Sequence, residues 1–109
     1  MIIFLDRKAS AEEVKRASEE FRDYIKIIID IEKQVMAIGG NLHADAEKVL
    51  IKNGSSQENI WGGGYSITSR RIDTQAVINI RPRQGNDSME ILDAETRRRF
   101  IEIAEGFLK

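Results

Sequence analysis

The sequence contains no cysteine, and proline, histidine and tryptophan each occur once. The absence of cysteine excludes disulfide bonds, thiolate chemistry, cysteine-ligated zinc and iron–sulfur clusters. No apolar run approaches the roughly 20 residues that a transmembrane helix needs. The apolar start, Met1–Leu5, is too short for a signal peptide, and no basic segment precedes it. We therefore expect a cytoplasmic protein without a membrane partner.

An excess of charge of one sign is also lacking. The net charge is −1 and the pI is about 5.9, which argues against a nucleic-acid partner. Hydrophobic residues make up 41% of the chain and charged residues 32%, as in folded proteins rather than disordered ones. The isoleucine-rich apolar set beneath lysine, arginine and glutamate is typical of thermophile proteins. At 109 residues, we expect one globular domain over residues 1–109.

The periodicity of apolar residues predicts an α+β fold. Short or alternating apolar runs predict strands at residues 2–5, 24–32, 35–38, 59–67 and 73–81. Helical spacing behind capping residues predicts helices at residues 10–22, after Asp45 and after Asp93. The order is therefore β-α-β-β-α-β-β-α. It predicts two layers, with a mostly antiparallel sheet of about five strands and the helices on one face.

Two segments leave alternatives open. Residues 46–52 fit a helix, because Ala46, Val49 and Leu50 form an apolar stripe, but Val49–Ile51 is also a short strand-like run. The three glycines at 62–64 interrupt a predicted strand. They predict either a bulge or the close approach of another backbone or a ligand.

The main candidate binding site is a donor-rich loop that starts at the only proline. Its polar side chains are Arg81, Arg83, Gln84 and Asn86. A guanidinium can donate two parallel hydrogen bonds to a carboxylate or phosphate. Pro82 stiffens the loop, and Gly85 lets a backbone amide approach an anion. These features predict a small anionic ligand; the alternative is that the arginines pair with acidic residues of the protein itself.

His43, the only histidine, lies two residues before Asp45. On an extended segment both side chains would point to one side, as a catalytic acid–base pair or as two metal ligands. Further ligands would have to come from Asp30, Glu47 or Glu58, and no spacing marks them. We therefore assign no metal and no cofactor. The alternative is a hydrogen-bonded histidine next to a helix-capping aspartate.

Trp61 directly precedes the glycine run. A planar ring beside bare backbone could stack on a ligand, whereas the alternative is packing in the core. Known catalytic motifs are missing, because Ser55–Ser56 is not part of a Gly-x-Ser-x-Gly elbow and the glycines are not followed by the lysine of a phosphate-binding loop. The three arginines at 97–99 fan around the exposed side of the last predicted helix.

Several segments together carry a resemblance to a known family. They are Val35–Gly40, Leu42–Asp45, Asn53–Ser55, Gln57–Gly62 and Ile78–Asn86. In combination they resemble a family of small prokaryotic proteins that is classed as a domain of unknown function. The resemblance implies a compact stand-alone domain and carries no assigned activity.

Three functional hypotheses follow. The first is a small binding or regulatory module that holds an anionic ligand or an acidic partner through the arginine loop, with help from His43 and Asp45 and with Trp61 as a further binding candidate. The second is a hydrolase that uses His43 and Asp45, with or without a metal. The third is a structural homodimer formed through a sheet edge or the face that carries Ile28. The first two require that these polar residues, distant in sequence, meet in one cleft.

Overall fold

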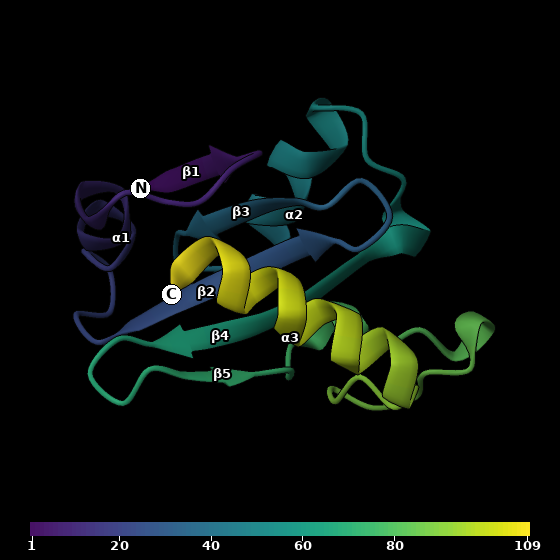
Figure 1. Ribbon diagram of the computed structural model, residues 1–109. Coiled ribbons are helices and arrows are strands. Elements are labelled where there is room, and N and C mark those ends of the chain that lie inside the picture. Colours follow the sequence, from purple (N-terminus) through teal and green to yellow (C-terminus); the bar gives the residue numbers. More distant parts are fainter.

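A five-stranded antiparallel sheet runs through the structure, a computed structural model that describes all 109 residues (Figure 1). The strands are β1 (Ile2–Leu5), β2 (Tyr24–Asp30), β3 (Val35–Gly39), β4 (Ile60–Ser66) and β5 (Arg71–Asp73). They lie in the order β1-β3-β2-β4-β5, so β2 is central. The alternating isoleucines of β2 explain its central position in the sheet, because Ile25, Ile27 and Ile29 are fully buried on one face.

Three helices complete the predicted order: α1 (Ala11–Ala17), α2 (His43–Lys52) and α3 (Ala94–Leu108). The α+β class and the antiparallel sheet are confirmed. Local capping explains two of the helix starts. Ser10 forms the expected capping box with Glu13, and the Asp93 carboxylate accepts a hydrogen bond from the Thr96 amide. None of the helices combines the length and apolarity that crossing a membrane requires.

Helix α2 answers the question of helix or strand at residues 46–52 and shows that the predicted helix start at Asp45 is wrong. Residues 46–52 are helical rather than extended. The helix already begins at His43, and Asp45 lies in its first turn instead of capping it. The residue at the cap position, Leu42, makes no side-chain hydrogen bond to the helix.

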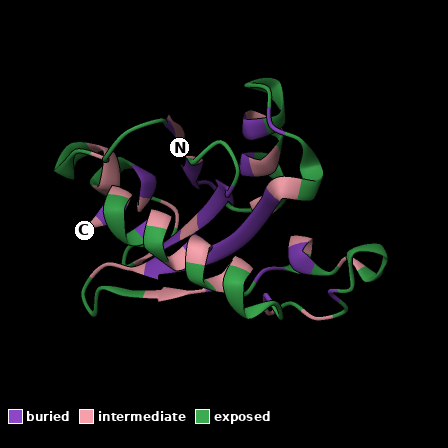
Figure 2. Ribbon diagram, turned by 45° about the vertical axis from the view of Figure 1, so that its right-hand side comes forward, coloured by how far each residue is buried: buried purple, intermediate pink, exposed green.

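The sheet is covered on both faces, so the expected placement of all helices on one face is wrong for α2. Phe100 and Ala104 of α3 and Ala17 of α1 pack with the main cluster of isoleucines. On the opposite face, Ala46 and Leu50 of α2 pack against Ile28 and Ala37. Central strands with apolar residues on both faces need cover on both sides. Figure 2 shows the central strands buried along most of their length.

The strand predicted at residues 73–81 is also wrong beyond Asp73. Residues Val77–Asn79 form a short 3-10 turn, η2, and Pro82–Gln84 form another, η3. The Asn79 side chain takes the place of a neighbouring strand. Its Oδ1 accepts from the Gly62 amide at 2.9 Å, and its Nδ2 donates to the Gly62 carbonyl at 2.9 Å. The chain is thus fastened to the edge of β4 by one buried amide.

The glycine run in β4 allows other parts of the chain to approach the strand closely, and it does not form a bulge. β4 pairs with β2 residue by residue through the run, without a bulge. A Cβ atom on Gly63 would overlap the backbone carbonyl of Asp73, and one on Gly64 would overlap the Tyr24 ring. A Cβ atom on Gly62 would lie 2.8 Å from that of Ala76. Bare backbone therefore allows β5, Tyr24 and the segment after β5 to lie directly on the strand.

Candidate functional site

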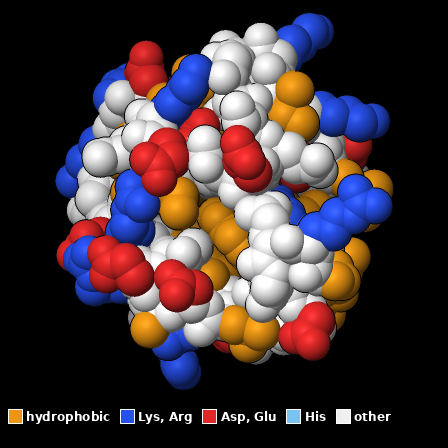
Figure 3. Space-filling model, turned by 90° about the vertical axis from the view of Figure 1, so that its right-hand side faces the viewer, with side chains coloured by type: hydrophobic (Ala, Val, Ile, Leu, Met, Phe, Trp, Pro, Cys, Tyr) orange, Lys and Arg blue, Asp and Glu red, His pale blue; other side chains and the backbone are white.

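The Arg81 side chain lies in a cavity of about 540 Å³ between α2 and the loop that follows η2. The lining residues are Glu47, Gln57, Ile78, Ile80, Arg81, Pro82, Arg83 and Gln84. The loop is closed by a backbone bridge between Arg81 and Asn86, and Gly85 adopts a left-handed conformation with φ of 76°. Figure 3 looks onto the end of the molecule where η1 (Gln57–Asn59) and η3 lie, and hydrophobic side chains are visible in a hollow between charged ones.

The Arg81 guanidinium is held firmly on three sides. Its Nε donates to the carbonyl of Ile78 at 3.0 Å, and its Nη1 donates to the carbonyl of Gln57 at 3.0 Å. Its central carbon lies 4.9 Å from the centre of the Trp61 ring, a cation–π distance. Only 11% of the side chain is exposed. Trp61 itself is buried in the main core cluster, so it supports the arginine from beneath.

Glu47 faces Arg81 across the base of the cavity. Its Oε2 lies 3.6 Å from Nη2 of Arg81, an ion-pair distance at which neither atom makes a hydrogen bond. The Glu47 side chain is 13% exposed. Burial lowers the pKa of Arg81, and the Glu47 charge opposes that shift. Arginine stays protonated at neutral pH, so Arg81 and Glu47 form a buried ion pair.

Glu47 was missed as a partner of the arginine loop in the sequence. It was considered only as a metal ligand. A signal was present, because Glu47 directly follows the buried Ala46 and lies one turn before Leu50 in α2. A charged residue next to an apolar helical stripe lies at the edge of a buried face, where it needs a partner.

The other predicted loop residues separate into two kinds. Arg83 is exposed, lines the cavity and makes no hydrogen bond or ion pair. Gln84 also lines it and donates to the Glu58 carbonyl at 3.1 Å. Asn86 is 3% exposed, and its amide nitrogen points to the carbonyls of Asn79, Ser88 and Glu90. It therefore holds the loop from inside and does not face the cavity.

His43 lies in a different cavity, of about 480 Å³, with Tyr24, Lys26 and Asp73. Its Nε2 donates to the Gly63 carbonyl at 2.7 Å, which fixes the tautomer and leaves Nδ1 as an acceptor. Burial is the main cause that lowers the pKa of His43. Asp45 is exposed and lines neither cavity, because residues two apart on a helix do not share a face. The expected single cleft is thus two cavities.

Comparison with known protein families identifies one that matches this chain. The family model described as a protein of unknown function, DUF5674, matches residues 3–107. The chain belongs to this family. The resemblance found in the middle of the sequence therefore extends over nearly the whole chain. No curated protein and no solved structure matches it.

The acidic residues considered as metal ligands do not gather in this DUF5674 protein. No group of three histidine, aspartate or glutamate side chains lies close enough to hold an ion. Asp30 accepts hydrogen bonds from the amides of Glu32 and Lys33, and so shapes the turn between β2 and β3. Glu47 faces Arg81 instead of His43. The histidine therefore has Tyr24, Lys26 and Asp73 as its ionisable neighbours.

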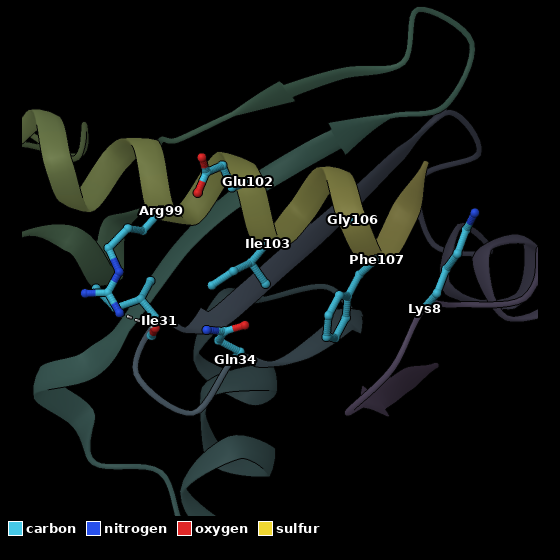
Figure 4. A pocket seen from close by; sticks show the side chains of 8 residues that line it. All are labelled: Lys8, Ile31, Gln34, Arg99, Glu102, Ile103, Gly106 and Phe107. Carbon is cyan, nitrogen blue, oxygen red and sulfur yellow. Dashed lines mark hydrogen bonds between the residues drawn. The ribbon is translucent and has the colours of Figure 1, made fainter.

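A third cavity of the DUF5674 protein, about 310 Å³, lies between α3 and the β2–β3 hairpin (Figure 4). Arg99 reaches across it from α3, donating to the Ile31 carbonyl at 2.8 Å and to Glu32 at 3.2 Å. Gly106 leaves room on the helix near the Phe107 ring. The guanidinium here is already occupied by the protein's own acceptors. The Arg81 cavity also contains Arg83, which makes no hydrogen bond or ion pair, and is therefore the stronger candidate for a ligand.

Proposed function

We propose that this protein is a small ligand-binding or regulatory module whose Arg81 cavity holds a small anionic ligand. One observation carries the proposal. Arg83 lines the cavity beside the buried Arg81, is exposed and makes no hydrogen bond or ion pair, so its guanidinium is open to a ligand. Arg81 is itself fixed by two backbone carbonyls and the Trp61 ring, and its charge adds to the positive potential that Arg83 presents to a ligand.

The charge balance of the cavity favours an anion. The guanidinium groups of Arg81 and Arg83 are opposed by the single carboxylate of Glu47. Arg83 has no acidic partner, so its charge is available at the rim. Attraction between charges is stronger in a partly buried site than in water. The cavity volume of about 540 Å³ lies in the range of small-molecule sites.

Isothermal titration calorimetry with phosphate, citrate and nucleoside monophosphates tests the proposal. We expect at least one of them to bind, and Arg83→Ala to weaken that binding roughly tenfold while leaving the fold intact. The matched control is Arg16→Ala, which removes the same charge from α1 at the other end of the molecule (Figure 1). Equal weakening by both variants, or no binding of any anion at millimolar concentration, contradicts the proposal.

An assembly role is the alternative proposal, and the structure narrows its surface. Ile28 is fully buried beneath α2, so the face that carries it cannot pair with another chain. β1 and β5 each pair with a strand on one side only, so the two sheet edges are the remaining surfaces for a homodimer. Light scattering at high protein concentration tests this role, and a monomer at every concentration removes it.

A hydrolase centred on His43 is the other alternative. The fixed tautomer leaves Nδ1 as the proton acceptor, and Lys26 and the Tyr24–Asp73 pair are its neighbours in place of Asp45. A phosphatase and esterase screen tests this role. An activity that survives His43→Gln excludes it.

A further inference from the structure

We infer that the cavity around His43 binds a free amino acid with an apolar side chain, held between Lys26 and Asp73. This cavity, of about 480 Å³, shares no lining residue with the Arg81 cavity. The inference therefore goes beyond the proposed anion site and does not depend on it. In this assignment Lys26 binds the carboxylate of the amino acid, and Asp73 binds its ammonium group.

The first support is a pair of opposite charges that line one cavity without pairing with each other. Lys26 lies on β2 and Asp73 on β5, and both stand opposite Gly64 of β4, which runs between them (Figure 1). Two strand spacings separate their Cα atoms by roughly 10 Å. A free amino acid carries both charges at neutral pH, so it meets an opposite charge at each end when it lies between these residues.

The second support is that the polar groups are open to the cavity. Nζ of Lys26 makes no hydrogen bond or ion pair, and its nearest aromatic rings are those of Phe21 at 4.9 Å and Tyr24 at 5.7 Å. Nδ1 of His43 is also unpaired, because only Nε2 makes a hydrogen bond. Neither nitrogen is among the buried unpaired atoms of the protein, so both have accessible surface. A ligand reaches them without breaking a bond of the fold.

The negative side of the cavity has acceptors to spare for an ammonium group. Oδ1 of Asp73 accepts from the Gln75 amide at 3.1 Å, and Oδ2 accepts from the Tyr24 hydroxyl at 3.0 Å. A carboxylate has about four acceptor positions, so these two bonds leave room for more. Burial lowers the pKa of His43, so its ring is neutral at pH 7 and Nδ1 is a further acceptor.

The third support is the apolar surface beside these charges. Ala76, Val77 and Met89 line the same cavity, and the side chains of Val77 and Met89 are 68% and 44% exposed. An adjoining cavity of about 340 Å³ also borders Val77 and adds Leu42, which is 60% exposed. An apolar ligand side chain covers this surface and gains free energy from its burial. The combination selects amino acids such as leucine, methionine and phenylalanine.

A ligand series on the wild-type protein tests the inference and does not depend on any variant. L-leucine, L-methionine and L-phenylalanine are the probes. For the tightest binder, the controls are the acid that lacks the amino group, the amine that lacks the carboxylate, and glycine. The ring signals of His43, the only histidine, follow each titration by NMR. We expect at least one probe to bind and each control to bind roughly tenfold more weakly or worse.

Two variants assign the ends of the ligand. Lys26→Met should bring the affinity of the amino acid down to that of its amine, because the carboxylate loses its partner. Asp73→Asn should bring it down to that of the acid. The matched control, Lys48→Met, removes an ammonium group from the exposed side of α2 and should leave the affinity unchanged.

The outcomes decide the assignment. No binding of any of the three amino acids at about 10 mM overturns the inference. An acid or an amine that binds as tightly as its amino acid also overturns it, because one of the two charges then plays no part. Equal losses in Lys26→Met and Lys48→Met have the same consequence. A preference for the amino acid that is lost in Lys26→Met and Asp73→Asn but kept in Lys48→Met supports it.

Discussion

Replacing Asn79 by aspartate tests how the irregular segment after β5 is held to the sheet. The change keeps the size of the side chain and removes its two amide hydrogens. In the structure, Nδ2 lies 2.9 Å from the carbonyls of Gly62 and Met89 and 3.3 Å from that of Thr74. The side chain is fully buried. A carboxylate there would face three carbonyl oxygens without a hydrogen to offer.

The magnitude follows from the bonds that are lost. Each buried acceptor left without a donor costs about 1–3 kcal/mol, so two lost hydrogens cost about 2–6 kcal/mol. A domain of this size has a total stability of about 5–15 kcal/mol. Burial also raises the pKa of the new carboxyl group above its unfolded value of about 3.9. The deficit should therefore be smallest at acid pH and should grow as the pH rises.

Urea unfolding, followed by the fluorescence of the single tryptophan and by circular dichroism, measures the effect between about pH 4 and pH 8. The control is Asn53→Asp, because Asn53 makes one exposed hydrogen bond to the Val49 carbonyl. That control should lose less than about 1 kcal/mol. A loss below about 1 kcal/mol in the Asn79 variant, or a loss that does not change with pH, would refute the reasoning.

Three further predictions concern other parts of the chain. Gly63→Ala should lower the free energy of unfolding by about 1–3 kcal/mol because its Cβ overlaps a backbone carbonyl, whereas Gly106→Ala in open helix should raise it by up to about 1 kcal/mol; urea titration compares them. Because burial lowers the pKa of His43 from its ordinary 6.5, the unfolded chain binds more protons below that pH. Stability should therefore fall as the pH drops through 6.5, and His43→Gln should remove this slope in urea midpoints measured across that range. Arg81→Met leaves the Glu47 carboxylate buried without its partner and should lower the thermal midpoint, with a loss of about 3 kcal/mol. Glu47→Met should lose less, because Arg81 keeps its two backbone carbonyls and the Trp61 ring.

The sheet, the order of the elements and two of the helix starts could be predicted from the sequence. The alternation from Ile25 to Ile31, the capping box at Ser10 and the capping side chain of Asp93 act over a few residues, so they can be recognised without the fold. The strand predicted after Asp73 was wrong because the prediction used only the local alternation of apolar residues. Ala76, Ile78 and Ile80 alternate as in a strand, but Asn79 bonds to β4 through its side chain rather than its backbone.

The candidate site was only partly visible in the sequence. Arg81, Arg83 and Gln84 do line one cavity, since the loop closes on itself through nearby residues. Glu47 enters that cavity from α2, more than thirty residues earlier in the sequence, and only the packing of α2 on Ile28 brings it there. His43 was placed in the same cleft, yet the start of α2 directs it to β4.

By itself the sequence determined most of the strands and helices and that the arginine loop is rich in donors, because these properties depend largely on neighbours along the chain. Only the tertiary structure decided that α2 covers the second face of the sheet, that Glu47 opposes Arg81 and that His43 lies apart from Asp45 and the arginine loop. Such contacts depend on the direction in which each buried face meets another, and this direction is set by packing rather than by local periodicity.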